Sequence, residues 1–219
     1  MEYSYELKIP KERVGALIGV GAKIKRQIED TTHTRLEIDS KEGDVRIVGE
    51  DGLGMLTAQE IVKAIGRGFN PDIAMRLGKQ DIALEIISLQ ESLGKSKNKM
   101  LRIKGRIIGQ DGSTRRIIED LTETSICVYG KTVSIIGEIE NVQTARRAIE
   151  RLLAGAPHAS VYRWLEKKGT ELRRRNREVR LADEAANPNL FKEDSASRHR
   201  SQRKKKAKAH SQARTPQKI

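Results

Sequence analysis

The stretch GRIIGQDGSTRR at residues 105–116 places two glycines, Gly109 and Gly112, between an apolar run and a pair of arginines. Glycine has no Cβ, so the backbone of such a turn can approach a bulky partner closely. A helix that begins directly after the turn presents free N–H groups and the positive end of its dipole to that partner. Arg115 and Arg116 add full positive charges in the same place. The stretch therefore predicts a phosphate-binding turn between two helices.

The same pattern occurs earlier in the chain. IGVGAKIKRQIED at 18–30 matches IGQDGSTRRIIED at 108–120 at an offset of 90 residues, and VRIVG at 45–49 matches VSIIG at 133–137 at an offset of 88. Two copies of one unit are expected, each with the element order β-α-α-β-β-α. In the first copy we expect strands at 5–9, 36–39 and 45–49 and helices at 11–18, 22–31 and near 53–67. In the second copy we expect strands at 82–87, 125–129 and 132–136 and helices ending near 108, starting at 113 and covering 140–153.

The overall charge favours a polyanionic partner. The 219 residues carry 43 Lys and Arg against 30 Asp and Glu, a formal net charge of +13, which favours nucleic acid or an anionic membrane surface. No stretch approaches the roughly 20 apolar residues of a spanning helix, and the amino terminus MEYSYELKIP lacks the apolar core of a signal peptide. We therefore expect a cytoplasmic nucleic-acid-binding protein with no membrane partner.

Most of the excess positive charge lies at the C-terminal end. From Glu171 onward there are 15 Lys and Arg against 6 Asp and Glu, which leaves 28 against 24 for residues 1–170. Beyond about Arg180 there is almost no large apolar residue, so we expect a disordered segment that cannot offset its ordering entropy. The run RKKKAK at 203–208 is interpreted as a sequence-independent contact with phosphates, the alternative being a solvated tail that aids solubility.

Nucleotide cofactors are not expected. The dinucleotide motif G-x-G-x-x-G must follow a strand, whereas Gly19-Val20-Gly21 follows a helical run and lacks a third glycine. No G-x-x-x-x-G-K-[ST] motif occurs either. We expect neither a cofactor nor a metal.

The element order with I-G-x-x-G between two helices resembles the type I KH domain, in which a GxxG loop clamps about four nucleotides of a single RNA strand. YGKTVSIIG at 129–137 and GAPHASVYRWLE at 155–166 are similar to archaeal members of the Dim-two / partner-of-Nob (Krr-like) family, and the similarity covers roughly residues 5–170. The resemblance implies an rRNA-binding factor for ribosome biogenesis and rRNA processing that acts near the 3′ end of small-subunit ribosomal RNA. It also implies contact with the Nob endonuclease and with the alpha subunit of translation initiation factor two.

The resemblance assigns the RNA-binding residues to both copies. Each copy departs from the motif once. In the first copy Ala22 replaces the last glycine, and in the second copy Asp111 places a carboxylate in the turn, where two arginines outnumber it. We therefore expect stronger RNA binding by the second copy. The candidate RNA-binding residues are Gly109, Gln110, Asp111, Gly112, Ser113, Thr114, Arg115 and Arg116, with Gly19, Val20, Gly21, Ala22, Lys23, Lys25 and Arg26 in the first copy.

Aliphatic side chains are expected to line the base-binding grooves. The chain has two Phe, one Trp and four Tyr. These are too few to supply the aromatic surface on which RRM-type sheets stack bases. Tyr162 and Trp164 are expected to pack rather than to stack on bases. The groove candidates, about two-thirds of which we expect to be core, are Leu17, Ile18, Ile28, Ile38, Ile107, Ile108, Ile117 and Val128.

Catalysis is the least favoured function. The four histidines, at 33, 158, 199 and 210, show no metal-binding or general-base pairing, and Glu37, Asp39 and Asp44 are expected to face solvent. His158 is interpreted as a helix cap or an RNA contact. The single cysteine, Cys127, excludes an internal disulfide and is expected to be buried in a strand. An RNA-processing enzyme remains a low-ranked alternative, and a KH-type regulator of messenger RNA or translation shares every feature of the turns.

The sequence thus predicts an α+β protein of two packed type I KH domains, acting as a non-catalytic, monomeric RNA-binding assembly factor for the small ribosomal subunit. The expected segments are a first KH domain at 1–70, a connecting segment at 71–80, a second KH domain at 81–156, a C-terminal helix at 157–180 and a disordered basic tail at 181–219.

Overall fold

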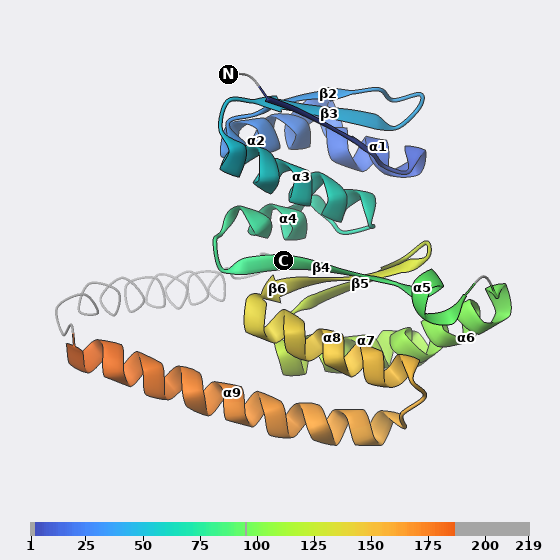
Figure 1. Ribbon diagram of the computed structural model, residues 1–219, viewed down its shortest axis with the longest axis vertical. Coiled ribbons are helices and arrows are strands. Elements are labelled where there is room, and N and C mark those ends of the chain that lie inside the picture. The colour runs from blue at the N-terminus through green and yellow to red at the C-terminus, as the bar shows by residue number, and fades with distance from the viewer. Residues whose placement is uncertain (1–2, 95, 187–219) are drawn as a thin grey trace, which may run out of the picture. The chain divides into compact units, whose positions relative to one another are not determined.

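The computed structural model describes residues 3–94 and 96–186 (Figure 1). The chain divides into two compact units, residues 1–169 and 170–219. The first unit contains both sequence copies, and the fold below is that of this unit.

The predicted element order occurs in the first copy, and it occurs in the second copy with one unpredicted short helix, α5 (Leu89–Leu93), added after the first strand. The first copy consists of β1 (Tyr3–Lys8), α1 (Lys11–Ile18), a 3-10 turn (Val20–Ala22), α2 (Lys23–Thr32), β2 (Arg35–Ile38), β3 (Asp44–Gly49) and α3 (Gly52–Gly66). The second consists of β4 (Ile82–Ser88), α5 (Leu89–Leu93), α6 (Lys97–Ile108), a 3-10 turn (Gln110–Gly112), α7 (Ser113–Thr122), β5 (Ser125–Tyr129), β6 (Thr132–Glu138) and α8 (Ile139–Leu153). The strands form two antiparallel sheets of equivalent order, β1-β3-β2 and β4-β6-β5.

Burial along the two central strands shows how the sheets differ. In β3, charged Asp44 and Arg46 are exposed while Val45 and Ile47 between them are buried, which is the alternation of a sheet with one solvated face. In β6 every residue from Thr132 to Gly137 is buried. The second sheet is therefore covered on both faces and the first on one.

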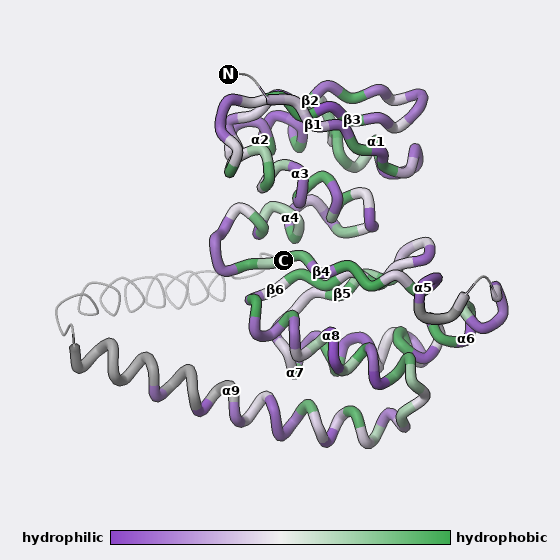
Figure 2. The backbone as a smooth tube through the Cα atoms, in the orientation of Figure 1, coloured by the Kyte–Doolittle hydropathy of each residue, from purple (hydrophilic) through white to green (hydrophobic). Residues whose placement is uncertain are grey.

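The cover of the second sheet comes from the first copy. Ile136 of β6 is fully buried within the core of the first copy, and Ile82, Leu84 and Cys127 pack against that core. Figure 1 shows α3 and the short helix α4 (Pro71–Ala74) between the two sheets, and Figure 2 shows the apolar character of β4 and β6. The two copies are thus packed together as the sequence predicted.

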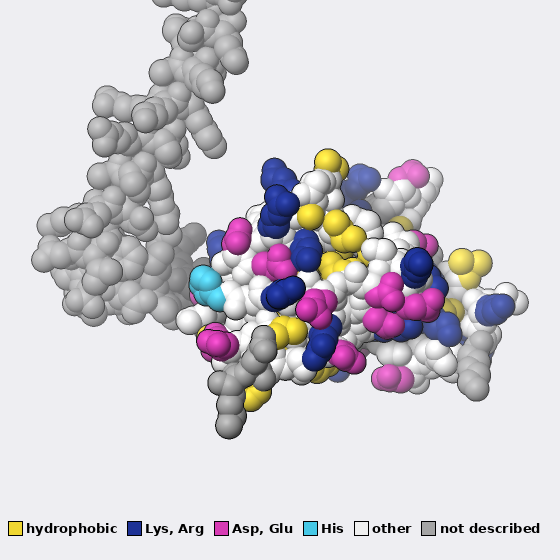
Figure 3. Space-filling model, turned by 90° about the horizontal axis from the view of Figure 1, so that it is seen from above, with side chains coloured by type: hydrophobic (Ala, Val, Ile, Leu, Met, Phe, Trp, Pro, Cys, Tyr) yellow, Lys and Arg dark blue, Asp and Glu magenta, His cyan; other side chains and the backbone are white. Residues whose placement is uncertain are grey.

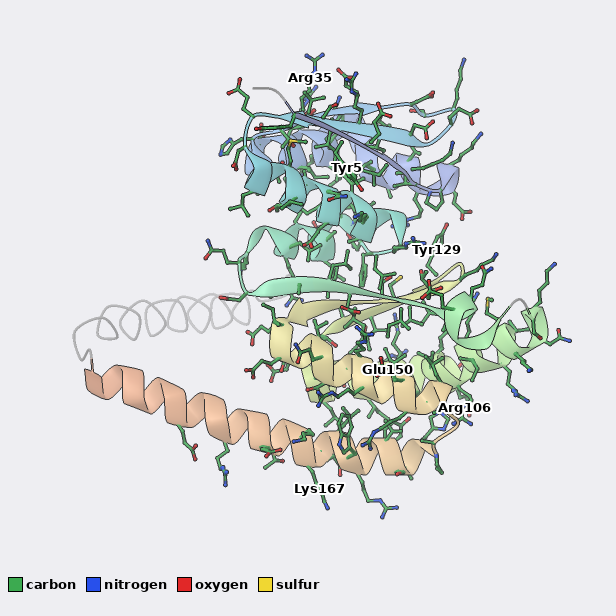
Figure 4. All side chains as sticks on the ribbon, viewed as in Figure 1. Tyr5, Arg35, Arg106, Tyr129, Glu150 and Lys167 are labelled. Carbon is green, nitrogen blue, oxygen red and sulfur yellow. The ribbon has the colours of Figure 1, made fainter. Side chains whose placement is uncertain are left out.

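Polar contacts hold the same junction. The Arg13 guanidinium donates to the carbonyl oxygens of Ile65 (2.9 Å) and Phe69 (2.6 Å), and the Tyr129 hydroxyl, labelled in Figure 4, donates to the Glu12 carboxylate. Cys127 is half-buried here rather than fully buried, because it lies on β5 at the edge of the junction. Burial raises the pKa of its thiol, against the opposing effect of the charges of Arg13 and Arg115.

The segment 71–80, expected as a simple connection, contains helical structure. Asn70 caps α4 through its side-chain oxygen, Pro71 occupies the start of the helix, and a 3-10 helix (Met75–Gly78) follows. Ala74 and Leu77 are buried in the core of the first copy. The segment is ordered because these two side chains add to the core, a contribution that its short Pro- and Gly-bounded sequence does not reveal.

The open face of the first sheet carries balanced charge. Arg46 lies between Glu6 (3.8 Å) and Glu37 (4.0 Å), and Lys8 pairs with Asp44 at 3.2 Å. Figure 3 shows basic and acidic side chains interspersed on this face. Such exposed pairs stabilise little, but their balance gives a polyanion no preferred site here.

The C-terminal helix α9 runs from His158 to Ala186, beyond the predicted end at residue 180. Its last residues, LADEAA, are rich in strong helix formers, which explains the extension. The remainder of the predicted basic tail, from residue 187 on, lies outside the described residues. Within the described part of the chain, no helix is long and apolar enough to cross a membrane.

Candidate nucleic-acid interface

The two glycine turns, Gly19–Ala22 and Gly109–Gly112, have the same backbone conformation. Gly19 has φ 72° and ψ 174°, and Gly109 has φ 74° and ψ 177°. The last two residues of each turn are left-handed, with φ values of 59° and 60° at Gly21 and Ala22 and of 51° and 78° at Asp111 and Gly112. The sequence repeat is therefore also a repeat of the site.

The first glycine of each turn is required for packing. A Cβ on Gly109 would lie 2.6 Å from the amide nitrogen of Thr114, and one on Gly19 would lie 2.5 Å from Cγ1 of Ile24. A Cβ on Gly112, by contrast, would meet only the Arg115 and Arg116 guanidinium groups, at 3.8 Å or more. Gly109 and Gly19 thus allow the helices to meet, while Gly112 leaves open space beside two cations.

Ala22 in the first turn has a strained backbone conformation. A left-handed φ of 60° costs an L-residue about 1–2 kcal/mol, a cost that glycine avoids. Ala22→Gly is therefore expected to raise the free energy of unfolding by about 0.5–1 kcal/mol, since the greater freedom of glycine in the unfolded chain offsets part of the gain. Urea denaturation would measure it. A destabilised variant would contradict this account of the turn.

The helices that follow the turns begin without side-chain caps. In the described part of the chain, neither Ala22 nor Gly112 caps the following helix with a side-chain hydrogen bond, and the first amides of α2 and α7, those of Lys23 and Ser113, donate to the Val20 and Gln110 carbonyl oxygens. The tips of the turns are exposed: Val20 is 95% exposed, and Gln110 and Asp111 lie on the surface. The positive end of a helix dipole, next to an accessible turn, forms a site that favours an anion.

The cations differ in how they approach the second turn. The Arg116 guanidinium donates to the Asp111 carbonyl oxygen at 2.9 Å, which holds its charge against the turn. Arg115 is half-buried and lies 3.9 Å from Glu119. Arg116 is therefore the cation placed against the turn, while Arg115 is paired with an acid farther along α7.

The cations near the first turn do not contact its backbone in the way that Arg116 contacts the second turn. Lys25 lies 3.8 Å from Glu29, and Lys23 and Arg26 are exposed. No cation of the first copy is seen to bond the turn itself in the part of the chain that the structure describes.

Two predicted site residues of the second copy have different positions. Ser113 is exposed at the start of α7. Thr114 is only 4% exposed, and its hydroxyl is bonded to Tyr162 of α9 at 2.9 Å. Thr114 therefore supports the turn from beneath and does not reach the surface.

A groove of about 600 Å³ lies along α7 and β5, and none of its lining residues belongs to the second turn itself. Arg115 is at one wall, and the segment Gly68–Asn70 of the first copy contributes to another. Of the aliphatic groove candidates, Leu17, Ile28 and Ile107 are fully buried core residues. The half-buried candidates are Ile18, Ile38, Ile108, Ile117 and Val128.

Sequence reasoning missed two glutamates that connect a helix to the edge strand in each copy. Glu119 accepts a hydrogen bond from the Ile126 amide at 2.7 Å, and Glu29 accepts one from the Leu36 amide at 2.7 Å. The signal was present, because both residues occupy the same place in the matching sequences QIED and IIED. These bonds hold the edge strand against its helix in both copies.

Models of KH domains match both copies. Residues 4–64 match the KH domain model, and residues 83–170 match a model described as the eukaryotic type KH domain, type I, of the second domain of PNO1. The KH domain-containing protein MJ0443 of Methanocaldococcus jannaschii is 47% identical over 172 residues, which cover 77% of this chain and 75% of that protein. The chain belongs to the Dim2/PNO1 family.

Two further relatives agree with this membership. The pre-rRNA-processing protein PNO1 of Chaetomium thermophilum is 31% identical over 72% of this chain and 62% of its own length. Dim2p in the crystal structure of an a/eIF2alpha-aDim2p-rRNA complex from Pyrococcus horikoshii OT3 is 43% identical, with a TM-score of 0.73 over 78% of this chain and 96% of that one. The resemblance and the KH fold predicted from the sequence are thus confirmed.

The acidic and histidine residues considered for catalysis in this Dim2/PNO1 member are dispersed. Glu37, Asp39 and Asp44 are exposed on the β2–β3 hairpin, and His158 approaches the Arg106 carbonyl oxygen at 3.0 Å. Among residues 3–94 and 96–186, no group of three or more His, Cys, Asp or Glu could hold a metal ion. His199 and His210 lie outside the described residues.

Proposed function

We propose that this protein binds single-stranded RNA through the second glycine turn and acts as an assembly factor near the 3′ end of small-subunit ribosomal RNA. The observation that carries the proposal is the Gly109–Gly112 turn, which is exposed at Gln110 and Asp111, leads into the start of α7 and has the Arg116 guanidinium held against its backbone. This arrangement suits the phosphates of an RNA strand. The proposed role is non-catalytic and cytoplasmic.

The relatives suggest the RNA and the partners. The Chaetomium relative is named a pre-rRNA-processing protein, and the Pyrococcus relative was crystallised with a/eIF2alpha and rRNA. We extend both to this chain: rRNA as its ligand and the alpha subunit of translation initiation factor two as a partner. The Nob endonuclease is proposed as a further partner on the family resemblance, and the chain as a monomer.

The two turns are proposed to have unequal roles. The second turn presents polar Gln110 and two nearby arginines, whereas the first presents Val20, whose apolar side chain is almost fully exposed. An apolar tip beside a strained alanine is better suited to a protein contact or to weak RNA binding. We therefore assign the principal RNA contact to the second copy.

Crosslinking in cells followed by sequencing of the attached RNA tests the proposal. Enrichment of the 3′ region of small-subunit rRNA is the expected result. Enrichment of messenger RNA instead would favour the regulator reading of the same fold, and the absence of any RNA would reject both.

Salt dependence separates the contribution of the basic tail from that of the turns. Residues 187–219 contain ten Lys and Arg against two acidic residues, and each phosphate contact to a single strand contributes about 0.7 to the log-log salt slope. Truncation after Ala186 is expected to lower this slope and to weaken binding to target and unrelated RNA by a similar factor. Filter binding at several salt concentrations measures both. A truncated protein that kept its slope but lost discrimination would make the tail the reader of sequence.

A further inference from the structure

The start of α9 reaches both helices that flank the second glycine turn. Nε2 of His158 lies 3.0 Å from the carbonyl oxygen of Arg106, in the last turn of α6. One helical turn later, the Tyr162 hydroxyl donates to Oγ1 of Thr114 at 2.9 Å, in the first turn of α7. Residues four apart lie on the same face of a helix. One face of α9 therefore contacts both the end of α6 and the start of α7.

This face of α9 is anchored by neighbouring contacts. Val161 and Leu165 are fully buried in the core of the second copy. Arg106, which Figure 4 shows beside the segment leading into α9, donates to the Ala156 carbonyl oxygen at 2.7 Å. The hydroxyl of Tyr162 is therefore held in place by packing on both sides of it.

Thr114 transmits this contact to the turn. Its amide nitrogen and side chain lie directly against Gly109, where a Cβ would come within 2.6 Å of the nitrogen. The equivalent residue of the first copy is Ile24, an apolar side chain packed against that copy's core. A buried threonine hydroxyl costs free energy unless it is hydrogen-bonded, and Tyr162 supplies the bond. The second copy thus has a polar link at a position where the first has an apolar contact.

We propose that Tyr162 is a positioning residue for the second glycine turn, acting through Thr114 without touching RNA itself. Its hydroxyl fixes the start of α7 against Gly109, which orients the α7 amides and the Gly112 backbone toward a phosphate. The start of α9 is then a functional part of the RNA site of the second copy. This inference rests on the proposed role of that turn in RNA binding.

Tyr162→Phe in the full-length chain tests the link, because only the hydroxyl is lost. Affinity for a single-stranded RNA oligonucleotide from the 3′ end of small-subunit rRNA is expected to fall about threefold, the effect of one hydrogen bond. Amide hydrogen exchange at Gly112 and Ser113 is expected to become faster. Tyr129→Phe is the matched control, since it removes a tyrosine hydroxyl bonded to Glu12 at the junction of the copies. It should change neither the RNA affinity nor the rate of amide exchange.

A double-mutant comparison tests whether Tyr162 acts through Thr114. Thr114→Val removes the acceptor and keeps the shape, so Tyr162→Phe should cause no further loss of affinity in that background. An equal loss in both backgrounds, or no loss in the natural background, would overturn the positioning role. Gln110→Asp separates this failure from failure of the proposed function. If Gln110→Asp leaves RNA binding intact, the turn is not the RNA site; if it weakens binding and Tyr162→Phe does not, only the positioning role is wrong.

Discussion

Gln110→Asp is expected to weaken the binding of single-stranded RNA by at least about tenfold, or 1.4 kcal/mol. Gln110 is exposed at the tip of the second turn, beside Asp111. A second carboxylate there would repel a phosphate and would oppose the charges of Arg115 and Arg116. The positive φ values of the turn fall on its other residues, so the substitution introduces no left-handed strain. Fluorescence anisotropy with a labelled oligonucleotide measures the change.

Val20→Asp is the matched control in the first turn. It adds the same charge at the equivalent, 95% exposed position, so both variants place one new carboxylate at the tip of a turn, although one replaces an amide and the other an apolar side chain. We expect a smaller loss of RNA affinity from Val20→Asp. Equal losses would show that both copies bind RNA comparably, and circular dichroism would establish that both variants are folded.

Gly109→Ala is expected to lower the free energy of unfolding by about 3 kcal/mol, which combines the cost of a left-handed alanine with that of overpacking. The added Cβ would meet the Thr114 backbone 2.6 Å away, and φ at this residue is 74°. For a chain of this size the midpoint of thermal unfolding should fall by about 6–12 °C. Differential scanning calorimetry measures it.

Gly105→Ala controls for the loss of a glycine. Gly105 lies within α6, and a Cβ there meets no atom within 4 Å. In a helix interior alanine is favoured over glycine by up to about 1 kcal/mol, so this variant should be more stable than the natural protein. If Gly109→Ala were as stable as Gly105→Ala, the first glycine of the motif would not be a packing requirement.

The elements that the two copies share could be predicted from the sequence because the repeat supplied two versions of each, whereas α5, which occurs only in the second copy, was not predicted. The helix expected over Lys11–Ile18 and the strands around VRIVG and VSIIG form as predicted. The glycine turns were recognised because glycine spacing between apolar runs is a local signal. What the spacing cannot give is the direction of a side chain after the turn: Thr114 points inward to Tyr162, 48 residues away in sequence.

The junction of the copies left a signal that was not used. At the equivalent position of the central strands, the first copy has exposed Arg46 and the second has Ser134, which is fully buried. A charged residue exchanged for a small one in a repeat indicates that the second sheet lost contact with solvent. The helix at 71–74 also had a local signal, the Asn70 cap followed by Pro71, while the burial of Ala74 and Leu77 by the core of the first copy had none.

The two copies pack head to tail, because the helical layer of the first meets the sheet of the second through two different surfaces. Each end of such a stack has a free surface that could in principle accept another copy. Repeated without limit, such a head-to-tail contact would generate a fibre rather than a discrete particle. The chain terminates the series at both ends. The Glu6–Arg46–Glu37 ion pairs make the free sheet too polar to accept another helical layer, and Val161 and Leu165 of α9 occupy the core of the second copy. By this comparison the features resemble the terminal caps of repeat proteins, and we expect them to limit the array to two units.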